Sequence, residues 1–235
     1  MTPAATVKPP LDLFSDPVRK WFESSFEAPT PAQVEGWPAI ATGEHTLICA
    51  PTGSGKTLSA FLWGIDSLAR RPDELGTGVK IVYISPLKAL SYDIERNLRA
   101  PLAGIGAPIT VGLRTGDTPQ SQRRAMRKTP PDILITTPES LYLMISSGAR
   151  EILTGVETLI VDEIHAVAPS KRGAHMSLTL ERLDHLVKTN EEMRVSVQRI
   201  GLSATQRPLE RVGQFLVGSG RDCTIVDASK PKELD

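Results

Sequence analysis

Short apolar runs alternate with longer segments of helical period along the chain from Thr46 onward. The runs are rich in β-branched residues and almost uninterrupted by polar ones, a pattern typical of strands buried on both faces of a parallel sheet. We therefore expect an α/β fold with a mostly parallel sheet and helices on both faces. The expected strands are 46–50, 79–85, 109–114, 132–137, 158–162, 195–202 and 224–226, and the clearest helices are 55–70, 87–99, 119–128, 174–187 and 208–216.

Residues 1–45 follow a different pattern from the rest of the chain. Pro3, Pro9 and Pro10 punctuate the start, and helical periodicity then spans 17–25 and 30–41. This predicts an N-terminal helical extension over 1–45. The remaining stretch, 46–235, has the length of one large α/β domain.

The composition is that of an ordinary globular protein. Hydrophobic residues make up 40% and charged residues 23% of the sequence, which favours neither a disordered nor a membrane-embedded protein. The start lacks the features of a secretory signal, and no apolar run reaches the ~18 residues of a membrane helix. We therefore expect a cytoplasmic protein with no membrane partner.

Positive charge is concentrated in one stretch of a chain whose formal net charge is zero. Between Lys80 and Pro130, nine Lys or Arg residues stand against three acids. This distribution predicts a surface that faces a polyanion. The cluster at 123, 124, 127 and 128 has a second interpretation, because a solvated helix face has the same composition.

The segment 50–57, Ala-Pro-Thr-Gly-Ser-Gly-Lys-Thr, predicts a phosphate-binding loop. It follows an apolar strand and opens a helical run, so its backbone N–H groups can point at phosphate oxygens. Lys56 would reach the β and γ phosphates and Thr57 would bind Mg²⁺, although Ala50 replaces the usual first glycine. We expect ATP and Mg²⁺ as cofactors. The expected nucleotide-binding residues are Thr52, Gly53, Ser54, Gly55, Lys56 and Thr57, with Lys56 also catalytic.

Two carboxylates at the end of a later apolar strand complete the expected nucleotide site. Asp162 can hold Mg²⁺ through a water, and Glu163 can orient and deprotonate the attacking water. Ser203 and Thr205 follow another strand. Hydroxyls beside a carboxylate can relay its state, although Ser and Thr at strand ends more often cap a helix.

These segments, in this order, resemble motifs I (APTGSGKT), II (DEIH) and III (SAT) of superfamily 2 helicases. Residues 29–33 are similar to the Q motif, 86–90 to motif Ia and 137–141 to motif Ib. The longer segments 113–123, 162–186 and 201–216 look like the large helicase-related (Lhr) proteins of bacteria and archaea. The resemblance covers nearly the whole chain and implies a RecA-like P-loop NTPase domain.

The Lhr resemblance implies an ATP-driven 3′-to-5′ translocase and helicase on single-stranded DNA. It also implies a setting in DNA repair, with nucleoid association in the cytoplasm. RNA-directed branches of superfamily 2 share the same core motifs, so RNA or an RNA:DNA hybrid is an alternative partner.

The same resemblance assigns roles to further side chains. Gln33 would read the adenine edge, with an upstream aromatic such as Phe14 packing on the base. His165 would couple the carboxylates to motif III, through Ser203 and Thr205, and to a second domain. Residues expected to contact the strand backbone without reading bases are Ser85, Lys88, Arg114, Thr115, Thr136, Thr137 and Ser140. For each of these residues taken alone, a strand-end cap is the competing interpretation.

Superfamily 2 motors hydrolyse ATP between two RecA-like domains, and the second domain supplies arginine fingers. The sequence ends about thirty residues after motif III. We therefore expect only the first RecA-like domain here, with the second RecA-like domain and the C-terminal domains of a parent protein as partners. Two functional classes stay open: a helicase motor domain, and a nucleotide- or nucleic-acid-binding module without turnover. Glu163 favours the motor, because a module that does not hydrolyse ATP has no chemical use for it.

Overall fold

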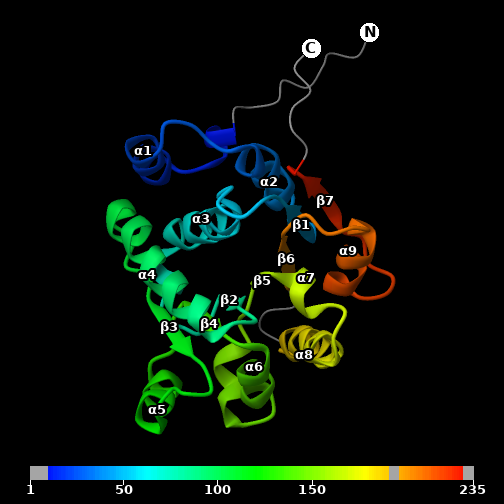
Figure 1. The fold of residues 1–235 in the computed structure, drawn as a ribbon. Coiled ribbons are helices and arrows are strands. Elements are labelled where there is room, and N and C mark those ends of the chain that lie inside the picture. The colour runs from blue at the N-terminus through cyan, green and yellow to red at the C-terminus, as the bar shows by residue number, and fades with distance from the viewer. Residues whose placement is uncertain (1–9, 191–195, 230–235) are drawn as a thin grey trace.

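The computed structural model describes residues 10–190 and 196–229, which contain a seven-stranded sheet (Figure 1). Its order is β3-β4-β2-β5-β6-β1-β7, and every neighbouring pair is parallel. The predicted α/β class with a parallel sheet is confirmed, although the start expected at 195 for the sixth strand lies outside the described residues. The strands are β1 Thr46–Cys49, β2 Ile81–Ile84, β3 Val111–Arg114, β4 Ile133–Thr136, β5 Thr158–Val161, β6 Gln198–Ser203 and β7 Thr224–Asp227.

Helices cover both faces of the sheet, and each face has its own core (Figure 1). Leu47 and Cys49 of β1 pack on one side, whereas Ile48 between them packs on the other. This alternation is the two-residue period of a strand with both faces buried. The first core contains residues of α6 Pro138–Ile145, α8 Lys171–Lys188 and α9 Leu209–Val217, and the second contains residues of α2 Pro31–Ala41, α3 Lys56–Ala69 and α4 Lys88–Ile105.

The length of α4 and the presence of α6 and α7 (Ile164–Val167) differ from the expectation. Helix α4 was expected to end near 99 but continues past Pro101 to Ile105, because Leu98, Leu102 and Ile105 pack into the second core. Burial of these side chains outweighs the single backbone hydrogen bond that proline removes. Three shorter helices complete the C-terminal two thirds of the fold: the predicted α5 Gln120–Lys128, and the unpredicted α6 and α7. There are also 3₁₀ turns at Pro72–Glu74 and Gly148–Leu153.

The N-terminal segment adds a third, aromatic cluster on top of α3. It contains the 3₁₀ turn Pro10–Leu13 and helix α1 Asp16–Ser25, followed by α2. Phe14 and Phe22 meet Trp37 of α2 edge to face, with ring centroids 4.8 and 5.4 Å apart. Leu62 of α3 belongs to the same cluster. The segment is therefore anchored to the helix that begins at the phosphate-binding loop.

Arg199, the second residue of β6, is almost fully buried and ties β6 to α8 and α9. Its guanidinium donates to Glu181 Oε1 at 2.7 Å, to Leu216 O at 3.1 Å and to Leu180 O at 3.4 Å. Arg221 donates to the same Glu181 carboxylate from the other side. A buried cation with this many acceptors is satisfied, and loss of the carboxylate would leave its charge without a counterion.

The Glu181 cluster predicts a pH-dependent part of the stability. Hydrogen bonds from Arg221 and Arg199 lower the pKa of Glu181 from 4.5 to about 2. The stabilisation is therefore complete above pH 4.5 and is lost as the pH falls from 4.5 towards 2. We expect Glu181→Gln to be less stable than the wild type at pH 7, with a difference that shrinks through this window.

Urea unfolding at pH 7, 4 and 3 measures this difference. Glu210→Gln, at an exposed acid of α9, is the control and should show no such closing gap. A stability difference for Glu181→Gln that stays constant across these pH values would contradict the assignment.

Candidate nucleotide and nucleic-acid site

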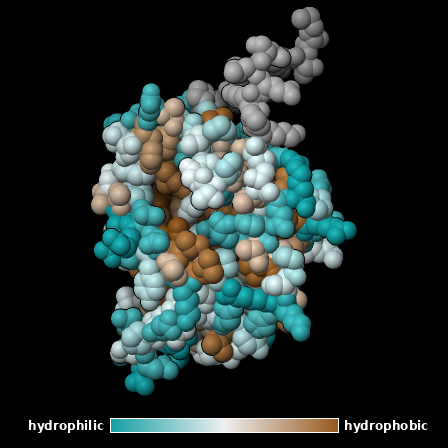
Figure 2. All heavy atoms as spheres, in the orientation of Figure 1, coloured by the Kyte–Doolittle hydropathy of each residue, from teal (hydrophilic) through white to brown (hydrophobic). Residues whose placement is uncertain are grey.

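The loops that follow β1 and β5 meet at the carboxyl edge of the sheet and line a cavity of about 640 Å³. The cavity also reaches α4. Apolar surface gathers near the centre of the face shown in Figure 2. Of the residues predicted for the nucleotide site, the cavity is lined by Gln33, Thr52, Gly53, Gly55, Lys56, Thr57, Asp162 and Glu163. Ser54 lies in the same loop outside the cavity lining, where its carbonyl accepts a hydrogen bond from Thr30 Oγ1 at 2.7 Å.

The phosphate-binding loop needs its glycines for backbone reasons. Gly53 and Gly55 have φ values of +81° and +78°, which side-chain-bearing residues rarely adopt. The Lys56 ammonium donates to the loop carbonyls of Ala50 at 2.6 Å and Pro51 at 2.8 Å. Burial lowers the pKa of Lys56, while the nearby Glu163 and Asp162 carboxylates act in the opposite direction. The loop thus holds the Lys56 ammonium near the carboxylates of Asp162 and Glu163.

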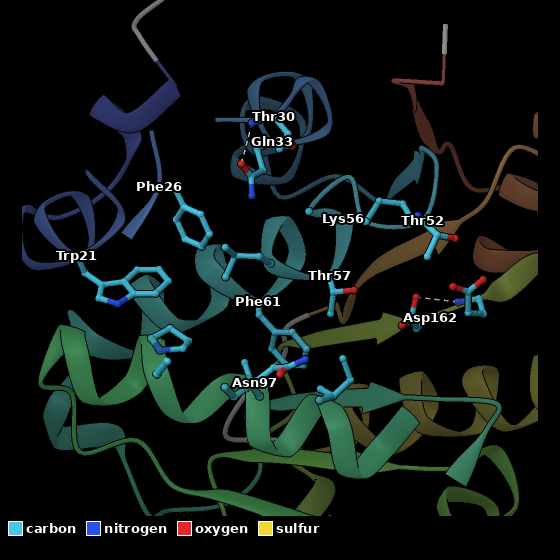
Figure 3. Close-up of a pocket in the computed structure, with 18 of the residues that line it drawn as sticks. Trp21, Phe26, Thr30, Gln33, Thr52, Lys56, Thr57, Phe61, Asn97 and Asp162 are labelled. Atoms are coloured by element: carbon cyan, nitrogen blue, oxygen red, sulfur yellow. Dashed lines mark hydrogen bonds between the residues drawn. The ribbon is translucent and has the colours of Figure 1, made fainter. Parts of the chain in front are cut away.

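Gln33 links the N-terminal helices to this loop. Its Oε1 accepts the Thr30 N–H at 2.9 Å, closing the N-terminal capping box of α2. Its amide nitrogen points into the cavity (Figure 3). A Cβ on Gly55 would lie 2.8 Å from this nitrogen, so a side chain there would displace the Gln33 amide. Gln33 therefore combines a capping role with a position facing the candidate nucleotide.

Phe26 is an exposed aromatic residue of the cavity lining, whereas the sequence had suggested Phe14. Phe14 is 5% exposed and belongs to the aromatic cluster with Trp37. Phe26 is 43% exposed and lines the cavity with Trp21 (Figure 3). Both phenylalanines lie upstream of Gln33, Phe14 before α1 and Phe26 directly after it. Their place in the sequence therefore does not tell which of them packs against Trp37 and which is left at the surface.

Asp162 is buried, and both of its carboxylate oxygens are engaged. Oδ1 accepts the Glu163 N–H at 2.9 Å, and Oδ2 accepts the hydroxyl of Tyr83 on the adjacent strand β2. Burial raises the pKa of Asp162, whereas the Tyr83 hydrogen bond lowers it. Tyr83 in turn stacks on Phe61 of α3, with ring centroids 4.9 Å apart. Tyr83 was not predicted as a site residue, because a tyrosine inside an apolar strand looks like a core residue.

Glu163 and His165 connect motif II to motif III. Glu163 has a left-handed backbone with φ +45°, unusual for a residue with a side chain. His165 Nδ1 accepts the Ala204 N–H at 3.2 Å, which leaves Nε2 as the protonated nitrogen in the neutral ring. Nε2 lies 3.4 Å from Glu163 Oε2. One imidazole therefore contacts both motifs.

The contact to motif III differs from the expected one. The Ser203 hydroxyl donates to Ala204 O at 2.9 Å, and Thr205 is exposed. The connection from His165 runs through the backbone N–H of Ala204, which lies between these two residues. The sequence indicated the right segment but not the atom that makes the contact.

Most hydroxyls predicted to contact a strand are buried and bond within the domain. Thr136 Oγ1 donates to Arg114 O at 2.7 Å, Thr137 caps α6, and Ser85 Oγ donates to Leu87 O at 2.9 Å. Thr115 and Ser140 are buried too. These hydroxyls therefore hold the loops of the domain in place.

Two predicted cations differ in their surroundings. Lys88 begins α4 and is exposed, and its ammonium lies 2.9 Å from both carboxylate oxygens of Asp117. Arg114 is 8% exposed, and its Nη1 has no hydrogen-bond partner among the described residues. Burial and the charges of Arg123 and Arg127 lower the pKa of Arg114. Lys88 is thus accessible to a ligand, whereas Arg114 is buried near the positive charges of Arg123 and Arg127.

Comparison with known proteins places this geometry in a family. The model of the DEAD/DEAH box helicase family matches residues 30–212, so the chain belongs to that family. Within it, the chain is most like proteins named Lhr. It is 51% identical to the Lhr helicase/uracil glycosylase of Escherichia coli over 92% of this chain, and 46% identical to the ATP-dependent helicase Lhr-Core of Methanocaldococcus jannaschii over 95%. It spans 15% and 27% of the lengths of these two relatives.

A solved structure supports the same relationship. The Mycobacterium smegmatis helicase Lhr bound to ssDNA and AMP-PNP is 56% identical, with a TM-score of 0.86 over 95% of this chain and 28% of that one. The RecA-like fold inferred from the sequence is therefore confirmed. In the described residues, no helix is both long and apolar enough to cross a membrane.

Tyr83→Phe tests the support of Asp162 from β2. The substitution removes one oxygen and leaves a buried carboxylate oxygen without its donor, which costs about 1–3 kcal/mol of the free energy of unfolding. Urea unfolding at pH 7 measures this loss. Tyr92→Phe, at a half-exposed tyrosine of α4, removes the same atom and should change stability little. Equal effects of the two substitutions would contradict the role given to Tyr83.

Proposed function

We propose that this chain is the N-terminal motor domain of an ATP-dependent helicase that translocates 3′-to-5′ on single-stranded DNA. The observation that carries the proposal is the cavity in which the phosphate-binding loop faces the Asp162-Glu163 pair, at the same sheet edge as the segments similar to motifs Ia and Ib. Similarity to a helicase solved with ssDNA and AMP-PNP supports it. Polarity, a role in DNA repair and association with the nucleoid in the cytoplasm rest on the Lhr likeness alone.

The nucleotide would lie in the cavity with its phosphates against the loop 52–57. Phe26 is the exposed aromatic available to the base, and Gln33 presents its amide nitrogen to the same space. Lys56 lies at the loop mouth and would turn from the loop carbonyls to the β and γ phosphates. Glu163 would orient the attacking water.

The donor set also fits Mg²⁺. The Thr57 hydroxyl and the Asp162 carboxylate are hard oxygen ligands, and both line the cavity. Because both Asp162 oxygens already accept hydrogen bonds, binding through a water suits this carboxylate. When bound, Mg²⁺ would neutralise charge on the phosphate oxygens.

A strand would lie along the sheet edge where α4 and α6 begin. Helix N-termini offer unpaired N–H groups and a favourable dipole to phosphates. The segments 86–88 and 137–139 provide two such ends, with Lys88 as an exposed cation. Contacts of this kind follow the backbone and read no bases, as translocation requires. RNA or an RNA:DNA hybrid offers the same phosphates and is the alternative partner.

We further propose that a second RecA-like domain closes the cavity and supplies arginine fingers. The chain spans 15% and 27% of the lengths of two curated relatives, which leaves room in such proteins for further domains. The competing function is a binding module without turnover. Retention of Glu163 in a strained conformation beside His165 favours the motor.

Lys56→Ala tests the nucleotide site. We expect it to abolish measurable binding of a fluorescent ATP analogue with Mg²⁺, because the loop loses the cation that faces the phosphates. Equilibrium titration measures this affinity. Lys20→Ala, at an exposed lysine of α1, is the control and should bind like the wild type. Unchanged affinity of Lys56→Ala would refute the site.

A turnover assay tests the motor and the need for a second domain. We expect this chain alone to hydrolyse ATP about 10³- to 10⁵-fold more slowly than a complete helicase, because arginine fingers contribute that much. Phosphate release with and without single-stranded DNA or RNA measures it. DNA-stimulated turnover at the rate of a complete helicase would contradict the need for a second domain.

A further inference from the structure

Arg172 joins three segments that lie far apart in the chain. It is the second residue of α8, and its Nη1 donates to Pro86 O at 2.6 Å in the loop before α4. Its Nε and Nη2 donate to the two carboxylate oxygens of Glu139 in the first turn of α6. These are charge-assisted bonds with the fork geometry that only arginine offers. One guanidinium thus contacts both segments proposed to bind a strand.

The base of Arg172 is fixed relative to the carboxylate site. Ser170 caps α8 by accepting the Gly173 N–H at 3.1 Å. A Cβ on Gly173 would lie 2.3 Å from Val167 O, so α8 begins directly against the backbone of α7. Helix α7 in turn follows Glu163 without a spacer. Arg172 therefore extends from a rigid unit that begins at motif II.

A cavity of about 370 Å³ separates this unit from the motif Ia segment. Pro86, Leu87 and Leu90 line one part of it, and Glu163, Val167 and Arg172 line another. Among the residues that the structure describes, the Arg172–Pro86 bond is the hydrogen bond that joins these two groups of residues. This contact therefore ties the loop before α4 to the unit that begins at motif II.

Arg172 also changes the charge that a strand would meet. Glu139 places a carboxylate at the N-terminus of α6, where it would repel a phosphate. The Arg172 hydrogen bonds hold the pKa of Glu139 below its ordinary value, so the carboxylate stays ionised and paired. The Arg172 guanidinium neutralises the negative charge of the Glu139 carboxylate at the surface.

We propose that Arg172 is a positioning residue that holds the entry of α4 and the start of α6 at one fixed spacing, so that both contact the same bound strand. The proposal rests on the strand-binding function proposed above. Arg172 need not touch the strand itself.

The contribution of Arg172 to folding should be small. Its side chain is 39% exposed and that of Glu139 is 53% exposed, and ion pairs at such sites add little stability. Arg172→Ala should therefore fold, so that a loss of affinity reports the lost contacts and not unfolding.

The first measurement is the affinity of the chain for a fluorescein-labelled oligothymidylate, by anisotropy. We expect Arg172→Ala to bind about tenfold more weakly than the wild type, because two charge-assisted anchors are lost. Arg172→Lys, which keeps the charge but not the fork, should fall between them. Arg211→Ala, which removes the same charge from an exposed position on α9, should bind like the wild type. Equal affinities for Arg172→Ala and the wild type would overturn the proposal.

The double variant Glu139→Gln/Arg172→Ala separates position from charge. If Arg172 only neutralised Glu139, this variant would regain wild-type affinity, and that result would overturn a positioning role. We expect it to stay close to Arg172→Ala, because the bond to Pro86 O is still missing.

Amide hydrogen exchange without any ligand makes the outcome independent of the proposed function. We expect faster exchange at 87–90 and 139–141 in Arg172→Ala but not in Arg211→Ala. Unchanged exchange would overturn the proposal. A wild-type chain without affinity for the oligonucleotide would contradict the strand-binding function instead, and the exchange rates alone would then decide whether Arg172 positions the two segments.

Discussion

In-register parallel pairing of β1, β5 and β6 determines where every part of the candidate site lies. Cys49 of β1 is opposite Ser203 of β6, and Val161 of β5 is opposite Gly201, so the three strands end within two residues of one another along β6. Because β6 lies between β5 and β1, the motif III segment is held between the phosphate-binding loop and the carboxylates. Burial on both faces fixes this register, since a slip of one residue would exchange the contents of the two cores.

The fold and the nucleotide loop were predictable because their signals are local. Nearly continuous apolar runs allow only buried strands, and the phosphate-binding loop needs glycine where φ is positive, as at Gly53 and Gly55. Motif order along the chain then predicts one site, because parallel strands bring their carboxyl ends to one edge. Helix α6 was missed because its eight residues follow a strand directly and begin with proline.

The contacts that complete the site were not predictable, because they depend on which way a side chain turns after packing. Phe14 and Phe26 look equivalent in the sequence, yet in the fold Phe14 is buried against Trp37 and Phe26 is exposed. The Tyr83–Asp162 and Arg172–Glu139 contacts span 79 and 33 residues. Thr136 lies in the segment where a strand contact was expected, but its buried hydroxyl donates to Arg114 O within the domain.

The strained backbone of Glu163 links these observations. A left-handed conformation costs a residue with a side chain about 1–2 kcal/mol, so neighbouring contacts must hold it. Asp162 accepts the Glu163 N–H, His165 lies against the Glu163 side chain, and α8 packs on α7 immediately afterwards. A change in the conformation of Glu163 would therefore act on three contacts at once: the backbone bond to Asp162, the side-chain contact to His165 and motif III, and the start of α7, on which the helix that carries Arg172 packs. One residue in an unfavourable conformation can thus connect the nucleotide cavity to the surface where a strand would bind.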